Sequence, residues 1–292
     1  MRYVQLRAFH HVASQGSFSR AAESLHLTQP AISDQVRKLE SEYDVRLFNR
    51  AKKQIAVTPE GEKLFEITRR MFEVEGQALE FLTETRSVKT GQLNIMADST
   101  HHVIDILEPF RQKHPSVFVS LRGGNTKAIV ASLLNYDADI GVLGDLPESR
   151  DFDVIKLNST PLVAFAASSG KFGQMNDIPF DKLAALPLVM REPGSMTRAK
   201  LEEHARKVGV KLKTQIEVEG REAVVEVVAS SDTIGVVSQA EFSNDPRLVQ
   251  IPITGVELTM DEALVCLRER KESLLIRTFM TAARMSVGVV GG

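Results

Sequence analysis

The sequence contains a single cysteine among its 292 residues, and this scarcity excludes an intramolecular disulfide. Cys266 lies in the apolar run Ala263–Leu267, so we expect a buried strand residue rather than half of an oxidation-sensing pair. No apolar run approaches the roughly 18 residues that a membrane-spanning helix needs. The N-terminal residues also lack the apolar core of a signal peptide. We therefore expect a cytoplasmic protein with no membrane partner.

The sequence also lacks the common motifs of catalysis and metal binding. It has no GxxxxGK[ST] phosphate loop, no HExxH zinc motif and no paired-cysteine site. The pair His101-His102 is the nearest metal-like feature, but adjacent residues on a helix point in different directions, which favours a capping or pocket role. We therefore predict that the chain is not an enzyme and has no catalytic residue, metal site or cofactor.

Charge is distributed unevenly along a chain whose net charge is only −2. Residues 1–58 contain nine Lys and Arg and five Asp and Glu, a net charge of +4, and the remainder carries a net charge of −6. Phosphate contacts supply most of the affinity that does not depend on DNA sequence. A basic N-terminal part joined to an acidic body is therefore typical of a protein whose N-terminal part binds DNA.

Residues 17–40 have the pattern of two short helices joined by a tight turn. The first helix carries an apolar face of small residues, which allows a second helix to cross at close range: Ala21, Ala22 and Leu25. Thr28 is a good N-cap for the second helix, and Pro30 stands in its first turn. The sequence therefore predicts a helix-turn-helix with a recognition helix at about 28–40, which enters a DNA major groove.

Amide, hydroxyl and basic side chains occupy the face of this second helix that points away from the first, and they suit base edges and phosphates. We expect the DNA contacts of this region to come from Ser17, Ser19, Thr28, Gln29, Pro30, Ser33, Asp34, Gln35, Arg37 and Lys38. A purely structural αα-hairpin is the alternative, but it would not need this polar face or the basic segment that follows it.

Residues 46–58 predict a basic wing that completes a mainly α-helical winged helix-turn-helix domain over 1–58. Arg50, Lys52 and Lys53 cluster at its tip, and the segment then alternates like a short strand. We expect these three side chains to touch phosphates or the adjacent minor groove, and so to position the recognition helix. A solvated basic turn is the alternative.

Residues 59–90 predict a long dimerising linker helix followed by a hinge. Pro59 can occupy the first helical position, and Glu60 and Glu62 favour the helix dipole there. Apolar residues at spacings of three and four form a heptad seam that needs a partner helix: Leu64, Ile67, Met71, Val74, Ala78 and Phe81. Pairing would give a homodimer or homotetramer whose recognition helices address the dyad half-sites of an operator. Packing against the chain's own effector domain is the alternative.

Strands and helices alternate in the rest of the chain. Strands are predicted at 93–97, 117–121 and 139–143, with helices at 101–114 and 126–135 between them. This order predicts an open α/β structure with parallel strands, in which ligands bind at the carboxyl ends of the strands.

Several motifs of the first sixty residues together resemble the N-terminal domain of LysR-type transcriptional regulators: Phe9-His10-His11-Val12-Ala13, Gly16-Ser17-Phe18, Ala21-Ala22, Gln29-Pro30-Ala31-Ile32-Ser33, Leu47-Phe48 and Thr58-Pro59-Glu60-Gly61. The later elements also follow the order of that family, so the resemblance covers nearly the whole chain. It implies an α+β protein with a winged helix-turn-helix, a long linker helix, and a two-lobed α/β effector domain similar to periplasmic binding proteins.

The same resemblance implies an effector-binding domain at 91–292 with two crossings between its lobes. Lobe I is expected at about 91–160 and 266–292, and lobe II at about 161–265, with a cleft between them. Three strand-to-helix junctions carry polar residues that would line this cleft, because helix N-termini, hydroxyls and arginine suit an anion. Each junction alone is more often an ordinary N-cap. The expected effector-binding residues are Asp98, Ser99, Thr100, His101, Asn125, Thr126, Ser195, Met196, Thr197, Arg198, Arg221 and Glu222.

Further strings resemble the LysR subgroup associated with aminoethylphosphonate catabolism: REPGSMTR (191–198), EGREAVVE (219–226), AEF-x-x-DPRLV (240–249), YDADIGVL (136–143) and LTQPAISDQVRKLE. A phosphonate would suit the hydroxyls and Arg198 or Arg221, and its ammonium group would suit Asp98 or Glu222. A carboxylate metabolite or an amino acid would satisfy the same groups. One departure is Ser230–Thr233, where members of the family often have a glycine-rich turn.

We therefore expect a sequence-specific transcriptional regulator controlled by a small anionic or zwitterionic metabolite, with 2-aminoethylphosphonate as the specific candidate. Its partners would be double-stranded operator DNA, the effector, further copies of itself and, as an additional candidate, RNA polymerase. A cytoplasmic solute-binding module would explain only the later two-thirds of the chain. An architectural DNA-binding protein would not explain the cleft.

Overall fold

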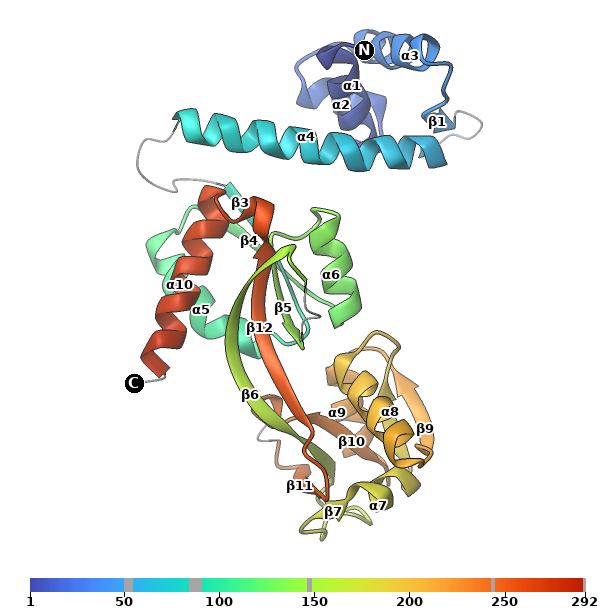
Figure 1. Ribbon diagram of the computed structural model, residues 1–292, viewed down its shortest axis with the longest axis vertical. Helices are drawn as coiled ribbons and strands as arrows, with labels where there is room; N and C mark the ends of the chain where they lie inside the picture. The colour runs from blue at the N-terminus through green and yellow to red at the C-terminus, as the bar shows by residue number, and fades with distance from the viewer. Residues whose placement is uncertain (50–54, 84–90, 146–148, 243–244, 291–292) are drawn as a thin grey trace. The chain divides into compact units, whose positions relative to one another are not determined.

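The computed structural model describes residues 1–49, 55–83, 91–145, 149–242 and 245–290 (Figure 1). The predicted wing residues Arg50, Lys52 and Lys53 lie outside these ranges. The chain divides into two compact units, 1–85 and 86–292, and each is described separately below. Among the described residues, no helix combines the length and the apolar character needed to cross a membrane.

The first unit is a winged helix-turn-helix followed by a long helix, as the sequence predicted. Its elements are α1 (Tyr3–Gln15), α2 (Phe18–Ser24), α3 (Gln29–Glu42), β1 (Phe48–Asn49), β2 (Ala56–Val57) and α4 (Pro59–Thr83). Strands β1 and β2 pair antiparallel, with Phe48 opposite Val57. The core between the helices consists mainly of Phe9, Val12, Ala21, Ala22, Ile32, Val36, Leu39 and Leu47.

Local signals in the sequence set the boundaries of these helices. Gly16 ends α1 in the left-handed region at φ 61°, where glycine carries no steric penalty. The hydroxyls of Ser17 and Thr28 accept hydrogen bonds from the first turns of α2 and α3, as N-caps do. The Oε1 atom of Glu40 accepts the N–H groups of Leu47 and Phe48 at 2.8 and 3.2 Å, which fastens the wing to α3.

Helix α4 packs along α1 through aromatic side chains. The His10 ring lies 5.2 Å from the ring of Phe65 and 4.7 Å from that of Phe72, and its Nδ1 is 3.1 Å from the hydroxyl of Thr68. Tyr3 contacts the edge of Phe72 and donates a hydrogen bond to Glu75 at 2.5 Å.

The predicted seam of α4 is divided between two environments. Leu64 and Met71 pack against the core of their own unit, whereas the side chains of Ile67 and Val74 are 64% and 63% exposed. Ala78 is also exposed, and the side chain of Phe81 lies outside the described part of the chain. The seam is thus not one continuous interface, since two of its six apolar residues, Leu64 and Met71, pack against the core of their own unit.

The second unit contains a ten-stranded sheet whose main path runs β4-β3-β5-β12-β6-β10-β8-β9, with β11 on β6 and β7 on β11. Its elements are β3 (Gly91–Ala97), α5 (His101–Lys113), β4 (Val117–Gly123), α6 (Thr126–Leu134), β5 (Ile140–Gly144), β6 (Phe152–Ala167), β7 (Ile178–Pro179), α7 (Phe180–Ala185), β8 (Leu188–Arg191), α8 (Met196–Val208), β9 (Thr214–Val218), α9 (Arg221–Ala229), β10 (Ile234–Ser238), η1 (Gln239–Glu241), β11 (Leu248–Thr254), β12 (Thr259–Leu267), η2 (Arg268–Arg270) and α10 (Leu274–Val290).

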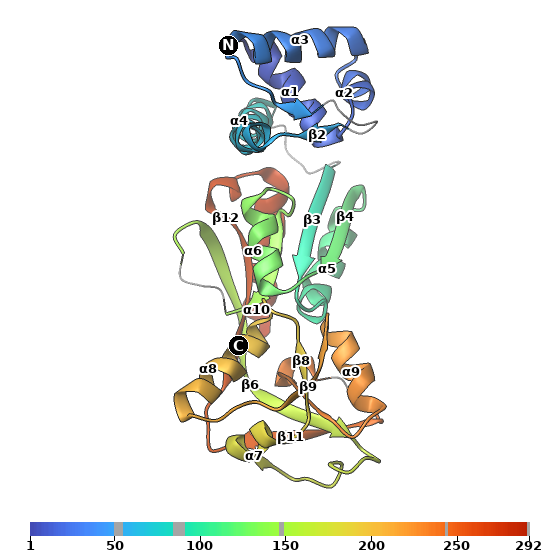
Figure 2. The same ribbon diagram turned by 90° about the vertical axis from the view of Figure 1, so that its right-hand side faces the viewer.

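Two α/β lobes share this sheet, as Figure 2 shows. Strands β3, β4 and β5 pair in parallel around one apolar core, as predicted, and β8 pairs in parallel with β9 and β10 in the other lobe. Cys266 is fully buried in β12, in agreement with the sequence analysis.

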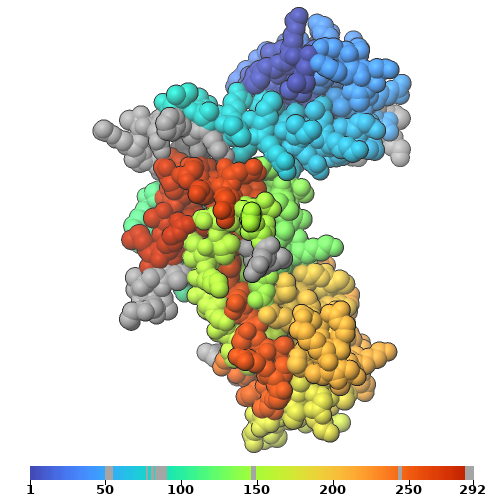
Figure 3. Space-filling view, in the orientation of Figure 1, coloured from blue at the N-terminus to red at the C-terminus, as the bar shows by residue number. Residues whose placement is uncertain are grey.

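The two long antiparallel strands β6 and β12 pass from one lobe to the other (Figure 1). In the space-filling view, green and orange-red surface from these parts of the chain lies where the two lobes meet (Figure 3). The family resemblance placed the start of lobe II near residue 161, whereas the strand that enters this lobe, β6, already begins at Phe152. In its first part β6 pairs with β12, and from Leu162 onward it pairs with β10. These two strands form the connection between the lobes.

Candidate functional site

The outer face of α3 presents the polar side chains that the sequence assigned to DNA. Gln29, Arg37 and Lys38 are exposed, whereas Ile32 and Val36 on the opposite face are buried. Ser33, Asp34 and Gln35 are half-buried along the same outer face. A helix of 14 residues with one buried apolar face and one exposed polar face has the form that fits into a major groove.

Not every residue predicted to contact DNA is free to do so. The hydroxyls of Ser17 and Thr28 serve as N-caps, and Lys38 forms an ion pair with Asp34 at 2.7 Å. Ser19 is exposed on α2. The DNA contacts of all these residues stay predictions.

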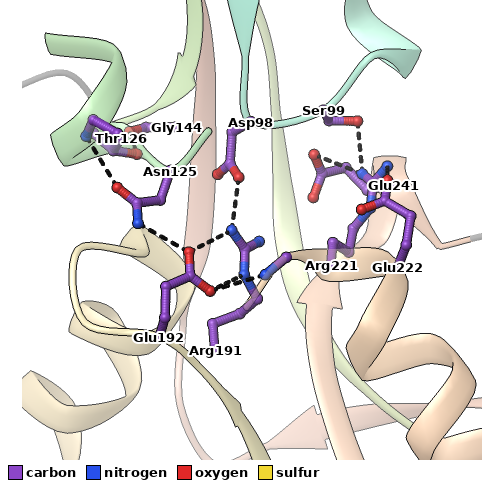
Figure 4. Close-up of polar contacts among 12 residues, drawn as sticks. Asp98, Ser99, Asn125, Thr126, Gly144, Arg191, Glu192, Arg221, Glu222 and Glu241 are labelled. Atoms are coloured by element: carbon purple, nitrogen blue, oxygen red, sulfur yellow. Dashed lines mark hydrogen bonds and ion pairs between the residues drawn. The ribbon is translucent and has the colours of Figure 1, made fainter. Parts of the chain in front are cut away.

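In the second unit, a chain of hydrogen bonds joins the two lobes through a buried arginine (Figure 4). Arg191, at the end of β8, donates to Asp98 after β3 at 3.1 Å, and also to the neighbouring Glu192 at 2.9 and 3.0 Å. Glu192 further accepts from the side chain of Asn125 at 2.9 Å and from the backbone of Gly220 at 3.1 Å. Burial opposes ionisation of Glu192, but Arg191 and Asn125 outweigh it and lower the pKa of Glu192 to about 2.

A second arginine makes a similar connection beside the first. Arg221, in the first turn of α9, donates to the hydroxyl of Ser99 at 2.6 Å and pairs with Glu241 of η1 at 3.0 Å. Its side chain is 15% exposed and that of Glu241 is 9% exposed. Ser99 follows β3, so Arg221 also reaches from the second lobe to the first (Figure 4).

A cavity of about 460 Å³ lies near these networks and gathers four of the other predicted residues, namely Thr126, Ser195, Met196 and Arg198. The Ser195 hydroxyl is buried and has no hydrogen-bond partner within the described ranges. Thr126 is buried and donates to the carbonyl of Gly144 at 3.4 Å.

The predicted effector residues therefore divide into three groups. The networks bring together Asp98, Ser99, Asn125 and Arg221, and the cavity brings together Thr126, Ser195, Met196 and Arg198. Thr197 is buried at the start of α8, Thr100 and His101 are exposed at the start of α5, and the Glu222 side chain is 78% exposed.

The environment of Arg198 differs from that of a free anion-binding group. Its guanidinium donates hydrogen bonds to Glu202 at 2.7 Å, to Glu217 at 2.5 Å and to the carbonyl of Arg191 at 2.9 Å. Two carboxylates thus already compensate its charge. Its contact with an effector stays a prediction, and an effector would have to compete for it.

Sequence reasoning did not assign roles to Arg191, Glu192 or Glu241. The sequence did indicate a role for Arg191 and Glu192, because they directly follow the apolar residues 188–190 of β8. Charged side chains at such a place have to reach water or find partners of opposite charge. Glu241 had no such signal, since its partner Arg221 is twenty residues away on another element.

Comparisons with known proteins cover both units. Residues 3–62 match the family model of the lysR family of bacterial regulatory helix-turn-helix proteins, and residues 86–287 match the LysR substrate binding domain. The chain is 28% identical over 282 residues to the HTH-type transcriptional activator CmpR of Synechocystis sp., which covers 94% of this chain and 92% of that protein. It is 34% identical over 264 residues to a RuBisCO operon transcriptional regulator of Acidithiobacillus ferrooxidans, which covers 87% and 84% of the two chains.

A full-length OxyR variant from Pseudomonas aeruginosa has the same fold, with a TM-score of 0.79 at 18% identity over 98% of this chain and 95% of that one. The names of these three proteins mention no phosphonate. The finer resemblance to an aminoethylphosphonate subgroup therefore has no support from them.

Proposed function

The chain belongs to the LysR family of bacterial helix-turn-helix transcriptional regulators, and from this premise we propose that a small anionic or zwitterionic metabolite, bound between the lobes, controls its action on operator DNA. The observation that supports this most directly is the pair of arginine bridges. Arg191 and Arg221 of one lobe contact Asp98 and Ser99 of the other. A ligand that binds Arg191, Arg221 or Asp98 would break or replace these contacts, and it would thereby change the interactions that connect the two lobes.

An effector that enters this cleft has to exchange partners with groups that are already paired. Its anionic group would replace Glu241 or Asp98 beside an arginine, and an ammonium group would replace an arginine beside Asp98. A zwitterion can make both exchanges without leaving an uncompensated buried charge, which would cost several kcal/mol (on the order of 3 to 5). An anion with several acceptor oxygens is the other ligand that arginine binds well.

Within this class, 2-aminoethylphosphonate is the specific candidate that the sequence strings suggest, and a carboxylate metabolite or an amino acid is the alternative. For the regulated genes, the relative at 34% identity, a RuBisCO operon transcriptional regulator, favours a RuBisCO operon as the candidate. The two questions are separate, because one concerns the ligand and the other concerns the DNA sequence.

Calorimetric titration of the purified full-length protein tests the effector site. The ligands are 2-aminoethylphosphonate, inorganic phosphate, a small carboxylate and an amino acid. We expect one ligand of this set to bind, and Arg221→Gln to weaken its binding at least about tenfold through loss of a charge-assisted hydrogen bond.

The matched control is Arg247→Gln, because Arg247 is also an arginine paired with two carboxylates, Glu226 and Asp245, but lies on the exposed surface. Equal affinity of the two variants for the ligand would contradict the proposed site. If only the carboxylate or the amino acid binds, that ligand replaces 2-aminoethylphosphonate as the candidate effector, and the proposed site stands.

We further propose that two chains pair through the exposed apolar stripe of α4, which contains Ile67, Val74 and Ala78. Exposed apolar side chains at this spacing favour a second helix over water. Val74→Glu should shift the protein toward monomer in sedimentation experiments and reduce its affinity for a two-half-site operator. If Val74→Glu has the same mass in sedimentation as the parent chain, the chains do not pair through this stripe.

A further inference from the structure

Beside the arginine bridges, three ionisable side chains converge on one buried point. His102 lies in the first turn of α5, Glu241 in η1 and Glu262 in β12. The Nε2 atom of His102 is 3.6 Å from Oε1 of Glu241 and 3.9 Å from Oε1 of Glu262. The three side chains are 4%, 9% and 5% exposed, and one ligand atom from each lies within 4.8 Å of those of the other two.

The imidazole of His102 is aimed into this cluster but is not satisfied by it. Its Nε2 atom is buried and has no hydrogen-bond partner among the described residues, since both carboxylates lie beyond hydrogen-bond distance. Buried polar atoms without partners are rare in folded proteins. An unpartnered nitrogen that faces two carboxylates indicates that something belongs between them.

The other ring nitrogen of His102 has a partner that suits a metal-binding histidine. Nδ1 lies 3.5 Å from the amide nitrogen Nδ2 of Asn158. The binding of a metal ion at Nε2 requires the opposite orientation of this amide, in which its oxygen faces the ring, Nδ1 donates its proton to that oxygen, and the lone pair of Nε2 is directed into the cluster. Histidines that bind metals usually donate their second N–H to such an outer partner.

The charges of the cluster also favour a cation. Glu241 has Arg221 at 3.0 Å, but Glu262 has no guanidinium or ammonium partner of this kind in the described structure. Positive charge is thus missing at the place where His102 and Glu262 meet.

We propose that His102, Glu241 and Glu262 form a binding site for a divalent transition-metal ion. Imidazole nitrogen with two carboxylate oxygens suits Zn²⁺, Mn²⁺ or Fe²⁺, whereas Mg²⁺ and Ca²⁺ prefer ligands that are all oxygen. Bonds of about 2.1 Å in tetrahedral geometry place neighbouring ligand atoms about 3.4 Å apart. The distances of 3.6 and 3.9 Å from Nε2 of His102 to the two carboxylate oxygens need to contract by only a few tenths of an ångström, and the two oxygens lie within 4.8 Å of each other. Three protein ligands leave a fourth position for water or another small group.

The ligands come from different parts of the effector unit. His102 belongs to the lobe of β3, Glu241 follows β10 in the other lobe, and Glu262 lies on β12, which passes between them. A bound ion would therefore fasten the two lobes together at a point next to the bridge formed by Arg221. It could stabilise one arrangement of the lobes without any organic effector.

Titration with Zn²⁺ tests the site directly. Full-length protein without a histidine tag is treated with a chelator, and Zn²⁺ binding is measured by calorimetry. We expect one tight site per chain. His102→Gln and Glu262→Gln should each weaken it at least about 100-fold, because loss of an outer-shell partner alone typically costs about 10- to 100-fold. His204→Gln and Glu203→Gln, on the surface-exposed helix α8, are the matched controls and should leave the affinity unchanged.

A second readout separates loss of the ligand from loss of the fold. Co²⁺ in the site should give a visible absorption band that disappears in His102→Gln, while the circular dichroism of that variant stays that of the parent chain. No saturable binding of Zn²⁺, or binding that is equally tight in His102→Gln and His204→Gln, would overturn the site. The metal site and the Arg221 bridge share Glu241. Their tests are distinguishable, because the effector test uses Arg221→Gln and the metal test uses His102→Gln and Glu262→Gln.

Discussion

Basic side chains on α3 and in the effector cleft occupy opposite environments. Arg37 and Lys38 are exposed on the outer face of α3, whereas Arg191 and Arg221 are largely buried and contact carboxylates of their own chain. An exposed cation can meet a DNA phosphate with little loss of hydration, and it adds charge attraction as it does so. A buried, paired cation cannot simply add a ligand, because it has to release one partner to gain another. The first arrangement suits attraction to DNA, and the second suits a switch.

The largest expected effect of this difference is on stability. Arg191→Ala leaves the buried carboxylates of Asp98 and Glu192 without their cation, which should lower the free energy of unfolding by about 3–5 kcal/mol. Arg37→Ala, on the exposed face of α3, should change it by no more than about 0.5 kcal/mol. Urea unfolding of the full chain, followed by circular dichroism, measures both. Similar losses for the two variants would remove the distinction between the two regions.

DNA binding should show the next largest effect. Gln29→Ala and Ser33→Ala remove side chains that we assign to base edges, so each should cost about 1–3 kcal/mol on the operator and little on random DNA. Arg37→Ala should weaken both complexes and reduce the salt dependence by about one phosphate contact. Fluorescence anisotropy over a range of salt concentrations separates the two behaviours. Equal losses on specific and random DNA for all three variants would argue against this division of roles.

A smaller effect should follow from the pH dependence of the contact between α1 and α4. Burial against Phe65 and Phe72 lowers the pKa of His10 to about 4, and the positive charges of His11 and Arg69 add to the shift. The unfolded residue titrates near 6.5. Because a proton therefore binds the unfolded chain more readily, the stability that His10 contributes is complete above pH about 6.5 and is lost as the pH falls toward 4.

Thermal unfolding of the DNA-binding unit at pH 7 and pH 5 measures this effect. We expect the midpoint of the parent chain to fall at pH 5. His10→Phe keeps an aromatic ring between Phe65 and Phe72 and should remove most of that fall. His26→Gln, at an exposed position in the turn before α3, is the control and should keep it. A midpoint that drops equally in His10→Phe would place the sensitive group elsewhere.

The two regions also differ in how far the sequence reveals them. The polar face of α3 follows from the spacing of Ile32, Val36 and Leu39 alone, because a helix fixes the direction of every side chain within one turn of its neighbours. The cleft has no such local rule. Arg191 contacts Asp98 across 93 positions of the chain, and Arg221 contacts Ser99 across 122. Family resemblance found four members of these networks, but spacing could not show that the arginines already have carboxylate partners.

Helix α4 and strand β6 show why pattern alone left other features open. The apolar spacing of α4 is the same whether its partner is α1 or a second chain, so the sequence could not show that Leu64 packs inward while Ile67 stays exposed. In β6 the residues before Pro161 mix polar and apolar side chains, of which only Phe152 and Ile155 are buried, and pairing with β12 makes them a strand. In both elements, contacts with residues far away in the sequence determine the structure.

The smallest expected effect concerns the ion pair between Asp34 and Lys38 on the outer face of α3. Asp34 holds Lys38 at 2.7 Å in the favourable i,i+4 order, and such an exposed pair stabilises a helix by about 0.3–0.5 kcal/mol. Asp34→Asn should therefore lower stability by no more than that, while it frees Lys38 and removes a negative charge from the face of α3 that we assign to DNA. Affinity for random DNA should rise slightly at low salt, and the gain should vanish at high salt because the attraction is screened. If the affinity of Asp34→Asn for DNA falls instead, Asp34 contacts a base. Asp34 would then have to exchange Lys38 for a DNA partner, as the carboxylates of the cleft have to exchange an arginine for a ligand.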